Sequence, residues 1–178
     1  MPFLLKEGEM PNPPVVAMEI CDRAKTDWPP EIENVFGDRL KDPPAWAEAC
    51  EKKHGARMIC LRLLGAHPDY GNNSIEECVK TVKDVISAVT VPLIIVGCGQ
   101  KDKDNDIMPA CSQAAKGEKC LLGSAVQDNY KTLAASCLAD GHSIIGESPI
   151  DINIAKQVNI LISEMGLPPG RIAMDPTV

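Results

Sequence analysis

The sequence has 178 residues, 44 % hydrophobic and 24 % charged, which predicts one globular domain over residues 1–178. The net charge of −7 and the 3 % aromatic content argue against nucleic-acid binding, which uses basic patches and stacking side chains. No apolar run approaches the ~20 residues of a membrane span, and MPFLLKEGEM lacks a signal-peptide pattern. We therefore expect a cytoplasmic protein without a membrane partner.

Six short apolar segments have the length and aliphatic content of strands that are buried on both faces. They are residues 15–20, 57–63, 92–98, 119–124, 142–147 and 171–176. Between them lie helical patterns, of which the clearest follows a capping box formed by Ser74 and Glu77. Asp42, before Pro43 and Pro44, predicts an earlier helix start. Later helices are expected from Asn105 or Asp106 to Gly117, from Asp128 to Gly141, and from Ser148 to Gly166.

This order of strand and helix, repeated five times and followed by a sixth strand, predicts a parallel sheet of βαβ units. A doubly wound sheet favours a glycine-rich turn after its first strand, and CDRAKT contains no glycine. A (β/α)₈ barrel needs no such turn but takes about 250 residues. The predicted fold is therefore α/β of the TIM-barrel type, incomplete, with about six parallel strands. Residues 22–41 are expected to form a long functional loop.

The C-terminal ends of barrel strands carry the functional residues, and here they are polar. They comprise Asp22, Arg23, Arg62, Gly97, Gly99, Ser124, Asn129, Glu147, Ser148 and Asp175. Two alternatives remain open from the residues alone. Asn129 and Ser148 can instead cap helices, and Arg62 can form an ion pair within the sheet rather than contact a ligand.

The segment GCGQKDKDND, residues 97–106, resembles two kinds of binding loop only partly. Gly97 and Gly99 match G-x-G, but the third glycine of a phosphate loop is missing. The aspartates have calcium-loop spacing, but Ile107 and Gln113 stand where that loop has glycine and glutamate. We expect a flexible solvated loop.

Neither the eight cysteines nor the three histidines predict a metal site. No two cysteines are three residues apart, so the pattern lacks the C-x-x-C pair of zinc and iron–sulfur sites and predicts buried, reduced thiols. His67 is the one histidine expected at a strand C-terminal loop, which makes it the candidate base or cobalt ligand. The spacing alone shows no catalytic set.

Three stretches resemble one known family: PPVVAMEICD at 13–22, VPLIIVGCG at 91–99, and residues 120–177, above all SPIDINIAKQVNILI followed by MDPT. They are similar to the small subunit of the corrinoid iron–sulfur protein, called the delta subunit of the acetyl-CoA decarbonylase/synthase complex in archaea. The resemblance implies a barrel that pairs with a large subunit, and a corrinoid (cobalamin) held between the two over the barrel's C-terminal rim. Relative to that family, the chain is expected to be truncated at both ends.

The resemblance also implies a function in the reductive acetyl-CoA pathway. The corrinoid would carry a methyl group from methyl-tetrahydropterin, with its methyltransferase, to acetyl-CoA synthase, and this subunit would itself be non-catalytic. Asp22, Gly99, Asn129, Ser148 and Asp175 are the expected corrinoid-binding residues, chosen from their place on the rim. The alternative is a pterin-dependent methyltransferase, in which Asp22 and Asp175 bind the pterin ring.

Overall fold

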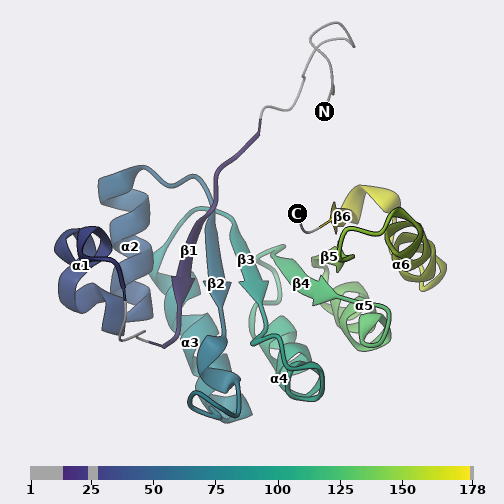
Figure 1. Cartoon of the computed structure of the whole chain (residues 1–178), viewed down its shortest axis with the longest axis horizontal. Coiled ribbons are helices and arrows are strands. Elements are labelled where there is room, and N and C mark those ends of the chain that lie inside the picture. Colours follow the sequence, from purple (N-terminus) through teal and green to yellow (C-terminus); the bar gives the residue numbers. More distant parts are fainter. Residues whose placement is uncertain (1–13, 24–27, 177–178) are drawn as a thin grey trace, which may run out of the picture.

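The computed structural model describes residues 14–23 and 28–176. The segment MPFLLKEGEM and the last two residues therefore lie outside the described part of the chain. Six strands alternate with helices (Figure 1). In chain order the elements are β1 (Met18–Cys21), α1 (Pro30–Phe36), η1 (Gly37–Lys41), α2 (Pro43–His54), β2 (Ile59–Arg62), η2 (Leu64–Ala66), α3 (Ile75–Ala88), β3 (Leu93–Val96), α4 (Lys101–Ala114), β4 (Leu121–Ala125), α5 (Tyr130–Asp140), β5 (Ser143–Glu147), α6 (Ile152–Glu164), η3 (Pro169–Arg171) and β6 (Ile172–Asp175).

The strands form one sheet in the order β1-β2-β3-β4-β5-β6, and every neighbouring pair is parallel. The helices follow the outside of this curved sheet, as a TIM barrel requires (Figure 1). The sheet is not closed, because β1 and β6 each pair with one strand among the described residues. The predicted α/β fold of the barrel type, incomplete with six parallel strands, is confirmed.

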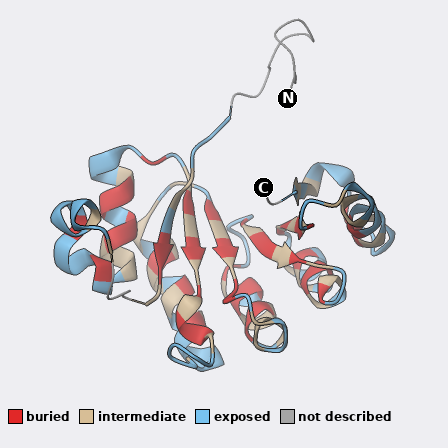
Figure 2. Ribbon diagram, viewed as in Figure 1, coloured by how far each residue is buried: buried red, intermediate tan, exposed pale blue. Residues whose placement is uncertain are grey.

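The core lies between the outer face of the sheet and the helices (Figure 2). Ile20, Ile59, Leu61, Ile95 and Ile144 are fully buried on that face. They pack with helix residues that include Cys50, Val82, Ile107, Cys137 and Ile162. Aliphatic burial of this kind contributes roughly 25 cal/mol for each Å² of apolar surface removed from water.

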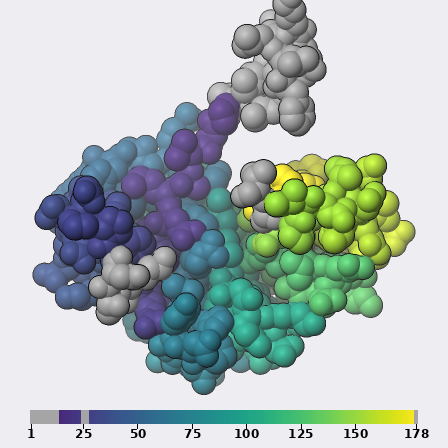
Figure 3. All heavy atoms as spheres, in the orientation of Figure 1, coloured from purple at the N-terminus to yellow at the C-terminus, as the bar shows by residue number. Residues whose placement is uncertain are grey.

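The inner face of the sheet is less covered than the outer face. Side chains of β2 alternate between buried and half-buried, and Cys60 and Arg62 are the half-buried ones. Ile94 and Val96 are half-buried in the same way on β3. In a closed barrel such side chains fill the interior in layers. The space-filling view shows β1 and the C-terminal segment on opposite sides of an indentation (Figure 3).

Several helix boundaries follow the expected chemistry. The hydroxyl of Ser74 accepts a hydrogen bond from the N–H of Glu77 at 3.2 Å, and the Glu77 carboxylate accepts one from the N–H of Ser74 at 2.7 Å. Asp42 caps α2 by accepting from Ala45 N–H at 3.3 Å. Gly141 ends α5 in the left-handed conformation, with φ of 88°.

Other boundaries differ from the prediction. Residues 101–106 form the first turns of α4 rather than a flexible loop, because Gln100 caps the helix through a 2.6 Å bond from Lys103 N–H. The last helix begins at Ile152 with Asp151 as its cap, so Ser148 does not start it. The expected long loop over 22–41 contains α1 and η1, whose Phe36 and Leu40 are buried against the core.

Among the helices in residues 14–23 and 28–176, none has both the length and the apolar content that crossing a membrane requires.

Candidate functional site

A cavity of about 210 Å³, which we call the rim cavity, lies at the C-terminal ends of β2, β3, β4 and β5. The arrowheads of β1, β2 and β3 point to the same end of the molecule (Figure 1). The residues that line the cavity are Arg62, Val96, Gly97, Gly99, Lys101, Asp104, Ser124, Val126, Asn129 and Glu147. Parallel strands bring residues far apart in sequence to one edge, so this site follows directly from the topology.

Asp104 fixes the loop between β3 and α4. Its carboxylate accepts hydrogen bonds from the backbone N–H of Cys98 at 2.7 Å and of Gly99 at 3.0 Å. A Cβ atom added at Gly97 would overlap the same carboxylate, so only glycine fits there. The N–H groups of Cys98 and Gly99 are therefore already hydrogen-bonded within the chain and are not free to bind phosphate. The G-x-G segment does not form a phosphate site here.

The first turn of α4 also contacts the loops on either side. Lys101 Nζ lies 3.2 Å from the Asp128 carboxylate in the β4–α5 loop, and Lys103 donates to Asn72 Oδ1 at 3.0 Å in the β2–α3 loop. Each contact is exposed and contributes little stability, about 0–1 kcal/mol for a surface ion pair. Together they place three consecutive loops along one rim.

Asn129 organises the β4–α5 loop from inside the rim cavity. Its Oδ1 accepts from the N–H of Val126 at 2.7 Å, and its Nδ2 donates to the carbonyl of Ser124 at 3.2 Å. The residue occupies the N-cap position of α5 but makes no side-chain cap bond, so its alternative role as a helix cap is not what the structure shows. One hydrogen of its amide remains available to a ligand.

Arg62 and Glu147 supply opposite charges to the cavity. Arg62 donates to Glu19 across β1 and β2 at 3.0 Å, and both side chains are about two-fifths exposed, at 37 % and 43 %. The ion-pair alternative for Arg62 is confirmed, and because the residue also lines the cavity, contact with a ligand stays a prediction. Glu147 ends β5, and its side chain makes no hydrogen bond or ion pair with any described residue, so its carboxylate can accept from a ligand.

The structure separates the expected site residues into two groups. Gly99 and Asn129 line the rim cavity, whereas Asp22, Ser148 and Asp175 lie outside its lining. Asp22 accepts from Gly65 N–H at 2.6 Å and from Asn73 Nδ2 at 3.4 Å, which ties the β2–α3 loop to β1. Burial raises the pKa of Asp22, while the bonds from Gly65 and Asn73 oppose that rise.

Ser148 and Asp175 meet through the backbone at the end of the sheet. Ser148 N–H donates to the carbonyl of Asp175 at 2.9 Å, and the side chain of Ser148 is fully buried. This bond continues the pairing of β5 with β6 by one residue. Both residues therefore hold the C-terminal end of the sheet together.

The thiols and histidines have structural surroundings. All eight cysteines are free, and seven of them are buried. Burial raises the pKa of Cys78 to about 12 and that of Cys50 to about 11, which keeps these thiols protonated. His67 accepts from Asp69 N–H through Nδ1 at 3.2 Å. Within the described ranges there is no group of three His, Cys, Asp or Glu residues placed to hold a metal ion.

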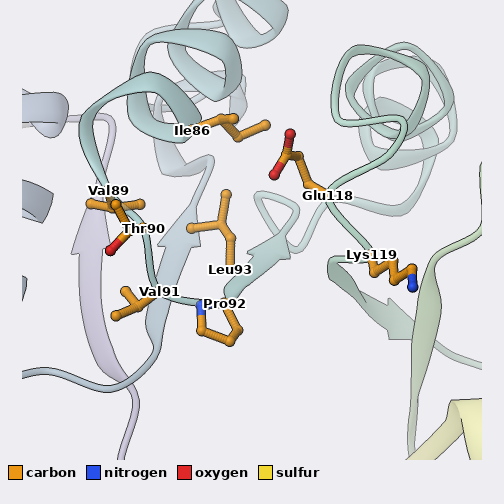
Figure 4. Close-up of a pocket in the computed structure, with 8 residues that line it drawn as sticks. All are labelled: Ile86, Val89, Thr90, Val91, Pro92, Leu93, Glu118 and Lys119. Atoms are coloured by element: carbon orange, nitrogen blue, oxygen red, sulfur yellow. The ribbon is translucent and has the colours of Figure 1, made fainter.

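A second and larger hollow lies at the other end of the sheet, where the chain enters β3 and β4. This opposite hollow has a volume of about 320 Å³ and is lined by Ile86, Val89, Thr90, Val91, Pro92, Leu93, Glu118 and Lys119 (Figure 4). The Glu118 side chain points toward Ile86, whereas Lys119 extends away (Figure 4). Its lining is mainly aliphatic and lacks the paired charges of the rim cavity.

Comparison with known proteins identifies the family of this chain. The model of the family described as "CO dehydrogenase/acetyl-CoA synthase delta subunit" matches residues 5–178. The chain belongs to this delta-subunit family. The acetyl-CoA decarbonylase/synthase complex subunit delta of Methanocaldococcus jannaschii is 37 % identical over 172 residues, which cover 96 % of this chain and 42 % of the relative.

Two further members of the delta family give a similar match. The subunit delta of Methanothermobacter thermautotrophicus is 36 % identical over 96 % of this chain and 44 % of its own length. That of Archaeoglobus fulgidus is 31 % identical over 98 % of this chain and 39 % of its own length. This chain therefore spans about two-fifths of the relatives that it matches.

Two residues that line the rim cavity were missed by sequence reasoning. Lys101 and Asp104 lie in the segment that was expected to be a flexible loop, so their places in the first turn of α4 were not foreseen. The signal was present in Gln100, a polar residue that caps a helix when its side chain accepts from the residue three positions later.

Proposed function

We propose that this chain is the corrinoid-binding, methyl-carrier subunit of a corrinoid iron–sulfur protein in the reductive acetyl-CoA pathway. It acts as a non-catalytic partner of the large subunit, which shares the corrinoid. Methyl-tetrahydropterin with its methyltransferase is the methyl source, and acetyl-CoA synthase is the acceptor. Membership of the delta family, whose name includes acetyl-CoA synthase, supports this proposal.

The single observation that carries the proposal is the rim cavity on the C-terminal face of a parallel α/β sheet, where barrels bind their ligands. Its residues fit the amide side chains of a corrinoid, because the lining combines hydrogen-bond donors with a carboxylate that has no partner among the described residues. Arg62, Lys101, Asn129 and Glu147 would hold amide side chains of the corrin. When bound, the cobalt of the corrinoid supplies the methyl-transfer chemistry.

The residues of this chain contribute binding and orientation. Asp104 fixes the β3–α4 loop, so that Gly99 lies at the cavity with its backbone position already set. Asn129 does the same for the β4–α5 loop. Preorganised loops lower the conformational entropy that binding would otherwise cost.

A pterin-dependent methyltransferase is the alternative function, and Asp22 bears on it. The carboxylate of Asp22 already accepts from Gly65 and Asn73, which leaves it less able to pair with a pterin ring. This observation favours the carrier over the enzyme. Titration of the chain alone with a methyl-tetrahydropterin separates the two functions, since micromolar binding would support the enzyme.

The test of the carrier function uses the chain with the large subunit. We expect absorbance spectra to show corrinoid uptake by the mixture and none by this chain alone. Arg62→Ala combined with Asn129→Ala should reduce uptake by about tenfold or more, since two polar contacts to the ligand are lost. Glu118→Gln, in the opposite hollow, serves as the matched control. Absence of corrinoid from the mixture would overturn the proposal.

A further inference from the structure

The charges that line the rim cavity are nearly all paired before any ligand arrives. Arg62 is bound to Glu19, Lys101 to Asp128, and the Asp104 carboxylate to the N–H groups of Cys98 and Gly99. Glu147 is the exception, since its carboxylate has no hydrogen bond or ion pair with any residue of the described ranges. A ligand in the cavity can therefore hydrogen-bond to the Glu147 carboxylate without displacing a described partner.

The lining charges balance, which disfavours a charged ligand of either sign. Arg62 and Lys101 are cationic, and Asp104 and Glu147 are anionic. A carboxylate in the cavity could bind Arg62 or Lys101 only in competition with Glu19 or Asp128, and it would also face Glu147. An ammonium group would bind Glu147 but would face Arg62 and Lys101. Like charges at about 4 Å repel by about 1 kcal/mol even in water, and more in a partly enclosed site.

The unused hydrogen-bonding groups are complementary to a ligand that both donates and accepts hydrogen bonds. Glu147 accepts only, whereas one Nδ2 hydrogen of Asn129 and further N–H groups of Arg62 can still donate. A primary carboxamide has two N–H donors and a carbonyl acceptor on adjacent atoms. A cavity of about 210 Å³ is large enough to admit this group.

From these observations we infer that the rim cavity selects a neutral primary carboxamide, and that Glu147 is the residue that discriminates against the corresponding carboxylate. This inference rests on the proposed function, since the carboxamide would be a side chain of the corrin. It adds that the amidated form of that side chain is required, and it names the residue responsible.

The first experiment titrates the full chain with propionamide, propionate and propylammonium, followed by NMR of the backbone amides. We expect propionamide to shift the signals of Gly99, Val126 and Asn129, and each charged analogue to bind about fivefold more weakly, as expected for one like-charge contact. Glu147→Gln should abolish the preference for propionamide over propionate, while Glu118→Gln should retain it. Because Glu147 has no described partner, its replacement should leave the melting temperature near that of the parent.

Three results would overturn the inference: no response to propionamide, equal binding of propionamide and propionate by the unmodified chain, or an unchanged preference in Glu147→Gln. A second experiment separates this failure from failure of the proposed function. The chain and the large subunit are mixed with cobalamin or with a cobalamin in which one side-chain amide is hydrolysed, and bound corrinoid is read from absorbance. Uptake of neither corrinoid contradicts the proposed function, whereas equal uptake of both contradicts the amide selection alone.

Discussion

The two ends of the sheet differ in the number and bonding of the polar groups that line their hollows. At the rim cavity, Asp104 and Asn129 satisfy backbone groups of two loops, and the Glu147 carboxylate has no partner among residues 14–23 and 28–176. At the opposite hollow, the lining is mainly aliphatic, and Glu51 holds the α3–β3 loop from outside by accepting from Thr90 N–H at 3.0 Å. Volume therefore does not identify the site, because the larger hollow is the one with fewer polar groups.

Removal of Asp104 should have the largest effect on stability, because two backbone donors at the rim lose their acceptor. We expect Asp104→Ala to lower the free energy of unfolding by about 3 kcal/mol, at about 1–3 kcal/mol for each donor left unpaired. Urea denaturation measures this change. Asp102→Ala is the matched control, since the Asp102 side chain makes no hydrogen bond with any described residue. If Glu51→Ala at the other end of the sheet proves more costly, the rim is not the more tightly organised end.

Substitution of Gly97 tests the same contact with the Asp104 carboxylate by changing the residue against which it packs. A Cβ atom at this position overlaps the Asp104 carboxylate, so Gly97→Ala should cost about 2 kcal/mol, as overpacking does. The double variant with Asp104→Ala should be destabilised by less than the sum of the two changes, because the collision is gone. Additive effects in urea denaturation would show that the carboxylate and Gly97 do not compete for this space.

The Arg62–Glu19 pair should matter less to stability than to binding. Both side chains are partly exposed, so solvent screens the pair, and Arg62→Met should change the free energy of unfolding by about 0–1 kcal/mol. The same change removes a donor from the rim cavity and should weaken uptake of the corrinoid by the mixture with the large subunit. Thermal denaturation measures the change in stability, and absorbance titration measures corrinoid uptake. A large loss of stability with unchanged uptake would show that Arg62 stabilises the fold rather than binds the ligand.

For Asp22 we predict the direction in which stability changes with pH. Its folded pKa is raised above the ordinary value of 3.8, so its contribution to stability is present below pH 3.8 and is lost as pH rises through the folded pKa. Asp22→Asn removes this loss and can keep the acceptor for Gly65 N–H. We therefore expect the variant to gain stability relative to the parent between pH 3.8 and neutrality. A constant difference across that range would show that Asp22 does not titrate as described.

Labelling of the thiols should show the smallest effect. Burial raises the pKa of Cys60 and of Cys98 to about 11, so at pH 8 both are almost entirely protonated and react slowly with Ellman's reagent. We expect little labelling of the folded chain and eight thiols after unfolding. Rapid labelling of several cysteines in the folded chain would contradict the buried positions along the core.

Sequence patterns predicted the fold well because its elements depend on local chemistry. Aliphatic runs gave the six strands, and the Ser74–Glu77 capping box marked the start of α3. Parallel order then predicted that polar strand ends share one rim. This reasoning found Gly99 and Asn129 in the cavity, as well as Arg62 and Glu147 among the wider set of rim residues.

The remaining details depend on contacts between segments that are distant in sequence. The role of Asp104 follows from the turn that brings α4 back over Gly97, and the pattern of acidic residues suggested only a solvated loop. Asp22 was placed on the rim correctly but not with its partners Gly65 and Asn73, which lie more than forty residues later. Side-chain direction at a strand end is decided by such partners and not by the strand pattern.

Hydrogen–deuterium exchange tests the central claim most directly, because it reports which end of the sheet the corrinoid and its partner cover. The chain is compared with its complex with the corrinoid-loaded large subunit. We predict slower exchange at residues 97–101 and 124–129, and at Glu147, with no change at residues 86–93 and 118–119. Protection confined to the second set of residues would place the partner at the opposite hollow and contradict a corrinoid site on the C-terminal rim.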